Sequence, residues 1–130
     1  MPDKGDITRD GWALESAEAR HEAHPETFRI PSALERSRLA IGDAAKLLFQ
    51  IETREQGRVV DSGFDRMWVI VRAHVASGYV GVLESDPGLA ENLRLRPGQD
   101  ILFGPEHICD VDHPPRAYII SKYGPEFFEP

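Results

Sequence analysis

The chain has 130 residues, of which 41% are hydrophobic and 28% are charged, which is an ordinary composition for a folded globular domain. This length supports one hydrophobic core and excludes a two-domain enzyme with separate cofactor and substrate halves. The 22 acidic and 15 basic side chains give a formal net charge of −7, which argues against broad binding to nucleic acid or to anionic membranes.

The sequence also lacks the usual features of exported and membrane proteins. Its apolar runs are far shorter than the roughly 20 residues that a transmembrane helix needs. The first residues, Met-Pro-Asp-Lys-Gly-Asp, contain no apolar segment typical of a secretory signal. Cys109 is the single cysteine, so no internal disulfide is possible. Together these features favour a cytoplasmic location.

The N-terminal part of the chain predicts a loose end followed by a helix. Residues 1–11 are mostly polar, and we expect them to be disordered or loosely held outside a single domain of residues 12–130. Strong helix formers over residues 12–24 predict a helix that lies on the surface of the domain. Residues 25–31 have a proline at each end and are expected to be extended.

The middle of the chain predicts antiparallel strands. Apolar and polar residues alternate between Ala45 and Thr53, which predicts a half-buried strand, and a glycine-containing loop is expected over residues 56–63. A second alternation from Met67 to Val75 predicts a long strand. One face of this strand is apolar and predicts core: Met67, Val69, Val71, Ala73 and Val75.

A three-residue loop at residues 76–78 is expected to close the central hairpin. This loop pairs Val71 with Leu83 and Val75 with Tyr79. The face of the strand that turns away from the core is amphipathic and contains Trp68, Ile70, Arg72 and His74.

The C-terminal half predicts a short helix at residues 87–93 and strands at 101–103, 107–111 and 117–122. The aromatic segment 123–128 is expected either to dock on the domain or to contact another chain. The connections are too short for parallel crossovers. The predicted fold class is therefore α+β, with a mainly antiparallel, strongly bent sheet of about five to six strands, an N-terminal helix and a short internal helix.

Several motifs carry a resemblance to a known family. They are His24-Pro-Glu-Thr-Phe-Arg-Ile-Pro31, residues 39–49, Arg66-Met-Trp-Val-Ile-Val71, Gly78-Tyr-Val-Gly81 and residues 95–110. On these motifs the chain resembles small bacterial domains of unknown function of the YegJ-like kind, over about residues 24–111. The motifs are mostly turn glycines and strand hydrophobics, so they bear on architecture. The resemblance also implies a role as an immunity protein beside a secreted toxin.

The most chemically suggestive residues are His107, Cys109 and His113. On a strand they share one face, and three nitrogen or sulfur ligands plus water would suit a catalytic zinc ion. Their spacing fits no standard zinc finger, and a buried free cysteine commonly packs as a small hydrophobe. A small metal-dependent enzyme or metal sensor built on these residues is therefore the alternative hypothesis, and our leading interpretation includes no cofactor.

Other candidate groups have simpler interpretations. His21 and His24 lie among glutamates and are best interpreted as a solvated helix face. Two arginine pairs, at positions 36 and 38 and at positions 94 and 96, are interpreted as surface solvation. The sequence contains no phosphate-binding glycine loop and no nucleophile elbow.

The leading functional hypothesis is a bacterial cytoplasmic protein-interaction module without enzymatic activity, acting as an inhibitor, an immunity-type protein or a homo-oligomer. Trp68, Arg72 and His74 are the predicted interaction residues, because tryptophan and arginine are enriched among residues that dominate interfaces. In the competing interpretation, the N-terminal helix or the C-terminal segment covers this face. A small-ligand-binding domain with a pocket in the bent sheet is a further alternative. The expected partner is another protein or a second copy, with no nucleic acid and no membrane.

Overall fold

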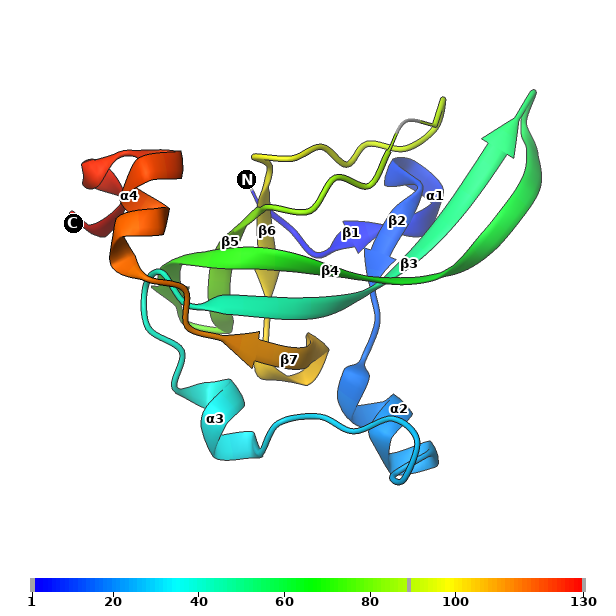
Figure 1. Cartoon of the computed structure of the whole chain (residues 1–130). Helices are drawn as coiled ribbons and strands as arrows, with labels where there is room; N and C mark the ends of the chain where they lie inside the picture. The colour runs from blue at the N-terminus through cyan, green and yellow to red at the C-terminus, as the bar shows by residue number, and fades with distance from the viewer. Residues whose placement is uncertain (1, 89, 130) are drawn as a thin grey trace.

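The protein is built around a strongly curled antiparallel β-sheet (Figure 1). The computed structural model describes residues 2–88 and 90–129. The predicted α+β class is confirmed, and the sheet has 7 strands in this part of the chain. Strands β1 to β6 lie side by side in the sheet in the same order as in the sequence, and β7 pairs with β3. The strands are Gly5–Asp6 (β1), Trp12–Leu14 (β2), Ala44–Glu55 (β3), Arg58–Val75 (β4), Gly78–Leu83 (β5), Asp100–Phe103 (β6) and Ile108–Asp112 (β7).

The helices are short and lie outside the curled sheet (Figure 1). None of the helices in residues 2–88 and 90–129 is long and apolar enough to cross a membrane. They are Ile7–Asp10 (α1), Ala17–Ala23 (α2), Ala33–Ser37 (α3) and Arg116–Tyr123 (α4), with 3-10 turns at Pro105–His107 and Pro125–Phe128.

The curl brings the two ends of the strand order together. The amide of Leu102 in β6 donates a hydrogen bond of 3.0 Å to the carbonyl of Asp3, just before β1. The main hydrophobic core fills the inside of this nearly closed sheet. Its members include Trp12, Leu47, Phe49, Met67, Val69, Val71, Leu83, Leu95, Ile101, Phe103 and Ile108.

Two separate covers protect the outer face of β3 and β4. At the first, Leu48 and Cys109 are buried beneath Ala17 of α2 and Phe28. Leu48 interrupts the alternation of β3, and this second apolar layer explains why an apolar residue stands there.

The second cover is the C-terminal segment. Ile119 of α4 and Phe127 pack with Ala44, Ile70 and Val82 in a cluster of their own. The aromatic C-terminal residues thus dock on the sheet, which is the first of the two outcomes expected from the sequence.

The central hairpin forms in a different register from the one predicted. Val75 pairs with Gly78, so the turn contains two residues rather than three. Val71 then pairs with Gly81 instead of Leu83, because the register shifts once more between Val71 and Ala73. This shift also explains why Met67, Val69 and Val71 are core residues while Val75 is 39% exposed.

The predicted loop at residues 56–63 is instead part of a long ribbon. Strand β3 continues to Glu55, the turn is confined to Gln56 and Gly57, and β4 begins at Arg58. The two strands project together from the body of the molecule as a twisted arm (Figure 1). We call residues 52–66 the arm.

The N-terminal residues are held more firmly than predicted. Among the described residues 2–11, Gly5 and Asp6 pair with β2, and Asp6 caps α1 by accepting hydrogen bonds from its first amides. The helix predicted over residues 12–24 begins only at Ala17, capped by Ser16, because Trp12 and its neighbours pair with β3 as strand β2.

Two C-terminal predictions are also wrong. Residues 117–122, predicted as a strand, lie within helix α4, whose buried Ile119 packs with Tyr123 one turn later. The short helix predicted at residues 87–93 is absent from the described residues of that range, which are irregular apart from a turn at Glu91 and Asn92, and position 89 lies outside them. The short internal helix is α3 instead.

Candidate functional site

The three predicted interaction residues all make contacts within the chain. Trp68 is partly buried against the cluster beneath the C-terminal cover. The guanidinium of Arg72 lies 5.7 Å from the Phe127 ring centroid, and its Nη1 lies 3.4 Å from Oδ1 of Asp100 without forming a hydrogen bond. The Nε2 atom of His74 lies 2.6 Å from the carbonyl oxygen of Leu39. Contact of these residues with a partner stays a prediction.

The structure does not bring His107, Cys109 and His113 together. His107 is buried and its Nδ1 accepts a hydrogen bond of 3.0 Å from the amide of Gly104. His113 is exposed, and its Nδ1 lies 2.9 Å from Oδ1 of Asp43. The residues described contain no group of three or more histidine, cysteine or acidic side chains that could hold a metal ion.

Cys109 is a buried neutral thiol. Burial raises its pKa to about 11, although nearby Arg66 and Lys46 act in the opposite direction. Because the thiolate is the nucleophilic and metal-binding form, the thiol is poorly suited to either role at neutral pH.

Arg36 is a structural residue that the sequence interpretation missed. It is 6% exposed, not a solvated surface residue. Its Nη1 donates to Glu18 and to the carbonyl of Pro105, while its Nε donates to the carbonyl of Pro31. These bonds tie α2, α3 and the turn before β7 together. The nearest sequence signal is the Ser-x-x-Glu cap of α3, which places position 36 inside a helix.

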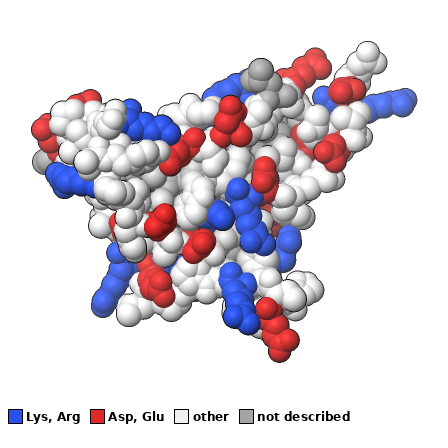
Figure 2. Space-filling model, viewed as in Figure 1, with Lys and Arg blue, Asp and Glu red and all other residues white. Residues whose placement is uncertain are grey.

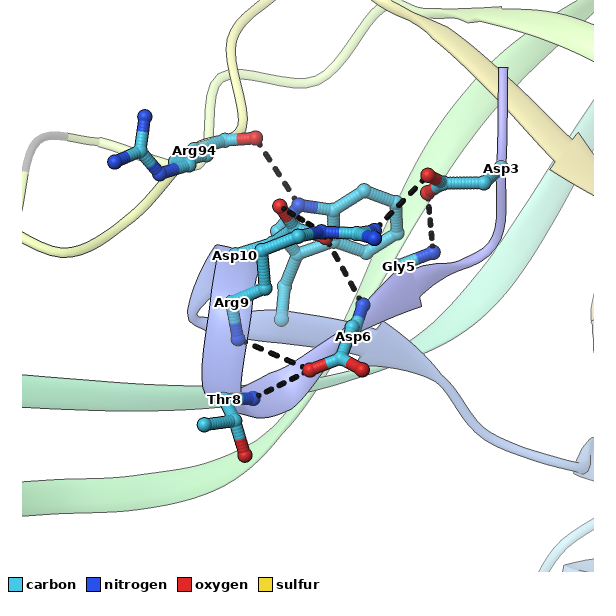
Figure 3. Close-up of polar contacts among 8 residues, drawn as sticks. Asp3, Gly5, Asp6, Thr8, Arg9, Asp10 and Arg94 are labelled. Carbon is cyan, nitrogen blue, oxygen red and sulfur yellow. Dashed lines mark hydrogen bonds and ion pairs between the residues drawn. The ribbon is translucent and has the colours of Figure 1, made fainter. Parts of the chain in front are cut away.

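The N-terminal segment forms a polar network (Figure 3). The Nη2 atom of Arg9 lies 2.6 Å from Asp10 and 2.9 Å from Asp3. The hydrogen bond from Arg9 lowers the pKa of the Asp10 carboxyl. Nearby, the indole Nε1 of Trp12 donates 3.0 Å to the carbonyl of Arg94.

A cavity of about 430 Å³ adjoins this network, lined in part by Asp3, Arg9 and Asp10. Most of its charged side chains already pair with one another. The arrangement therefore explains how the N-terminus is held against the sheet rather than how a ligand would bind.

The arm has two very different edges. Its β3 edge is closed: the amide of Glu52 donates 3.0 Å to the carbonyl of Gly11, and the amide of Arg54 donates 2.9 Å to Asn92 Oδ1. Gly11 adopts φ +78°, and an added Cβ would lie 2.7 Å from the side chain of Asn92, so this closure requires glycine.

The β4 edge of the arm is open. Strand β5 pairs with β4 only from Val69 onward, so in the described structure no strand lies beside residues 58–66 on that side. Val59, Val60 and Phe64 are 52%, 53% and 50% exposed on this stretch. The guanidinium of Arg20 lies 4.4 Å from the centroid of the Phe64 ring. We call residues 58–66 of β4 the open edge.

Comparison with family models, curated proteins and solved structures gives no match for this chain. The resemblance to YegJ-like domains therefore stays a prediction.

Proposed function

We propose that this protein is a non-enzymatic interaction module that binds an extended segment of another protein along its open edge. The observation that carries the proposal is an unpaired strand edge with three half-exposed apolar side chains, Val59, Val60 and Phe64. Unpaired edges readily accept a further strand, and folded proteins usually cover or shorten them. In strand addition, main-chain hydrogen bonds supply affinity and alternate side chains supply specificity.

The charges beside the open edge favour one kind of partner segment. The pairing with β3 places Phe64 and Arg66 on the outer face of the ribbon, where Arg20 also lies. Asp61 and Asp65 alternate with them and point to the opposite face. A segment with apolar and acidic residues on one face and basic residues on the other complements this pattern.

A second copy of the chain complements it less well. Antiparallel self-pairing centred on Ser62 places Arg58 opposite Arg66. The next register places Asp61 opposite Asp65. Like charges directly opposite one another destabilise a strand pair, and two chains of net charge −7 also repel each other.

The test of this function uses the wild type and two matched variants as baits to capture a partner protein from the native host. Val60→Asp places a charge on the open edge, whereas Val75→Asp makes the same change at an exposed valine beyond the arm. We expect the wild type and Val75→Asp to bind one purified partner equally, and Val60→Asp to bind it about tenfold more weakly. Amide exchange in residues 61–66 should slow when the partner binds.

Three outcomes would contradict the proposal. They are equal capture by the Val60→Asp and Val75→Asp variants, protection of amides elsewhere with none in residues 61–66, and a stable homodimer that Val60→Asp dissociates. The first two would remove the open edge from the interface. The third would assign it to self-association.

A further inference from the structure

An uncovered strip separates the two covers on the outer face of β3 and β4. The strip contains Lys46 of β3, which pairs with Trp68 at the second cover, and Arg66 of β4, which pairs with Leu48 beneath the first. A cleft of about 440 Å³ opens there, between the strands and the connection from α2 to α3. Figure 2 shows basic side chains gathered over this part of the molecule. The cleft is lined by Arg29, Ile30, Lys46, Arg66, Cys109 and Val111, among others.

Aromatic rings, not carboxylates, hold two of the cations in this cleft. The guanidinium of Arg66 lies 4.7 Å from the Phe28 ring centroid, and the ammonium of Lys46 lies 5.0 Å from that of Trp68. In the described part of the chain neither forms an ion pair, and Arg29 forms none either, although acidic residues outnumber basic ones in this protein. An aromatic ring attracts a cation electrostatically without accepting its N–H donors, so the donors remain free to bind a ligand.

Each of the two carboxylates at the cleft accepts a hydrogen bond from its own segment. Glu35 accepts a hydrogen bond of 3.2 Å from Ser32 at the start of α3, and Asp110 accepts one of 2.9 Å from the amide of Val111. The cleft thus has three cations against two carboxylates that bond to their own segments.

We propose that this cleft binds a small organic anion through a phosphate or carboxylate group. Arg29 and Arg66 offer planar guanidinium donors that match the oxygens of either group in bidentate fashion, and Lys46 adds a point charge. Ile30 and Val111 supply apolar walls for the rest of the ligand. The cleft volume falls within the range of small-molecule sites.

Cys109 provides a direct readout, because it lines the cleft and is the single cysteine. Because the buried thiol is mostly neutral, its reaction is slow, so the folded protein is treated with the neutral reagent iodoacetamide at pH 9, where more thiolate is present, and the rate at Cys109 is followed by mass spectrometry. The reaction is run in the presence of phosphate, butyrate or chloride at equal ionic strength. We expect phosphate or butyrate to slow alkylation of Cys109 about fivefold or more at saturation, as ligand occupancy excludes the reagent. Chloride should have no such effect.

Matched arginine variants identify the site. Arg66→Gln should lower the affinity for the protecting anion about tenfold, as expected for the loss of one charge-assisted bidentate contact. Arg116→Gln is the control, because Arg116 also lies over an aromatic ring, 3.9 Å from the Phe128 centroid, but outside the cleft. Lys46→Gln gives a second test at a residue on another strand.

Each result supports or overturns the proposal. Protection by phosphate alone assigns a phosphate ligand, protection by butyrate alone assigns a carboxylate ligand, and protection by both assigns their shared oxyanion chemistry. No protection by either overturns it, and so does equal weakening by Arg116→Gln. Val60 lies outside the cleft. Val60→Asp should therefore leave anion binding intact. A failure of the anion site and a failure of the open-edge function can thus be told apart.

Discussion

The same two strands form a well-protected part of this molecule and a part that projects into solvent. Near residues 44–49 and 67–71, β3 and β4 have the main core on one face and a helical or aromatic cover on the other. In the arm, the same pair of strands continues into solvent with exposed Val59 and Phe64. The ladder between them is continuous apart from one register shift between Thr53 and Arg54.

The covered end of the ribbon stabilises the fold, whereas the arm is available to a binding partner. At the covered end, burial of apolar area supplies stability, at roughly 25 cal/mol for each Å² removed from water. The arm gains little from burial, so its hydrogen bonds and turn must maintain it. A two-stranded ribbon is marginally stable when nothing packs against it. Such a segment is well placed to gain stability from a binding partner.

The largest predicted contrast is between two truncations of apolar side chains. Leu47 is fully buried, so Leu47→Ala should lower the free energy of unfolding by about 2 to 5 kcal/mol. Val59→Ala in the arm should change it by less than about 0.5 kcal/mol. Urea unfolding monitored by circular dichroism measures both. Comparable losses would mean that the arm is stabilised like the core.

A second contrast concerns arginines. Arg36→Gln removes charge-assisted hydrogen bonds from a buried guanidinium and should cost about 2 to 3 kcal/mol of unfolding free energy. Arg58→Gln at the exposed start of β4 is the matched control and should leave the unfolding midpoint unchanged. If both variants unfold at the wild-type midpoint, the bonds of Arg36 do not stabilise the first cover.

Two glycines give the third contrast. A Cβ at Gly81 would lie 2.9 Å from Val69 and 3.0 Å from Phe103 in the core, so Gly81→Ala should cost about 1 to 3 kcal/mol. Nothing lies within 4 Å of the same atom at Gly63 in the arm. Gly63→Ala should therefore be neutral or slightly stabilising. Thermal midpoints of the two variants, measured at one pH, decide whether the packing differs as described.

The two smallest expected effects are pH dependences, and the larger of the two arises at the covered end. Burial lowers the pKa of His107 below its ordinary value of 6.5. The unfolded chain therefore takes up a proton as the pH falls through 6.5, while the folded chain stays neutral at this site. Stability should decrease between pH 7.5 and 5.5. The arm contains no histidine, so its amide exchange protection should not follow this change.

His113 should have the opposite and weaker effect. The hydrogen bond with Asp43 raises its pKa, so its contribution is complete below pH 6.5 and is lost as the pH rises through the raised value. His113 is largely exposed, which keeps this effect small. Urea midpoints across this range should retain the decrease toward low pH in His113→Gln and lose it in His107→Gln. A decrease that persists in His107→Gln would assign it to other groups.

The sequence predicts the covered end of the ribbon well and the arm poorly. Alternation locates β3, the second half of β4 and the short strands β6 and β7, because each has one face in the core. Residues 56–63 have no such contrast, since both of their faces are exposed, and their glycines favour a loop. Neighbouring isoleucines in residues 117–122 favour a strand, although in helix α4 Ile119 and Tyr123 pack one helical turn apart.

The site residues follow a similar pattern. Composition identified tryptophan and arginine as interface residues but could not show that the C-terminal segment packs against Trp68. The cleft was not predictable, because Arg29, Lys46 and Arg66 come from three separate segments and their common location depends on the register of β3 and β4. Charge counts alone show only an acidic chain.

The hydrogen bond that joins Asp3 to Leu102 also constrains how the protein is made. The N-terminal segment can be fixed in the curled sheet only after β6 has been synthesised. At a translation rate of about 5 to 20 residues per second, Leu102 is added roughly 5 to 20 s after Asp3. During that interval Trp12 and the inner face of β3 lack most of their final packing partners. Protection from premature aggregation is therefore needed until β6 has been synthesised.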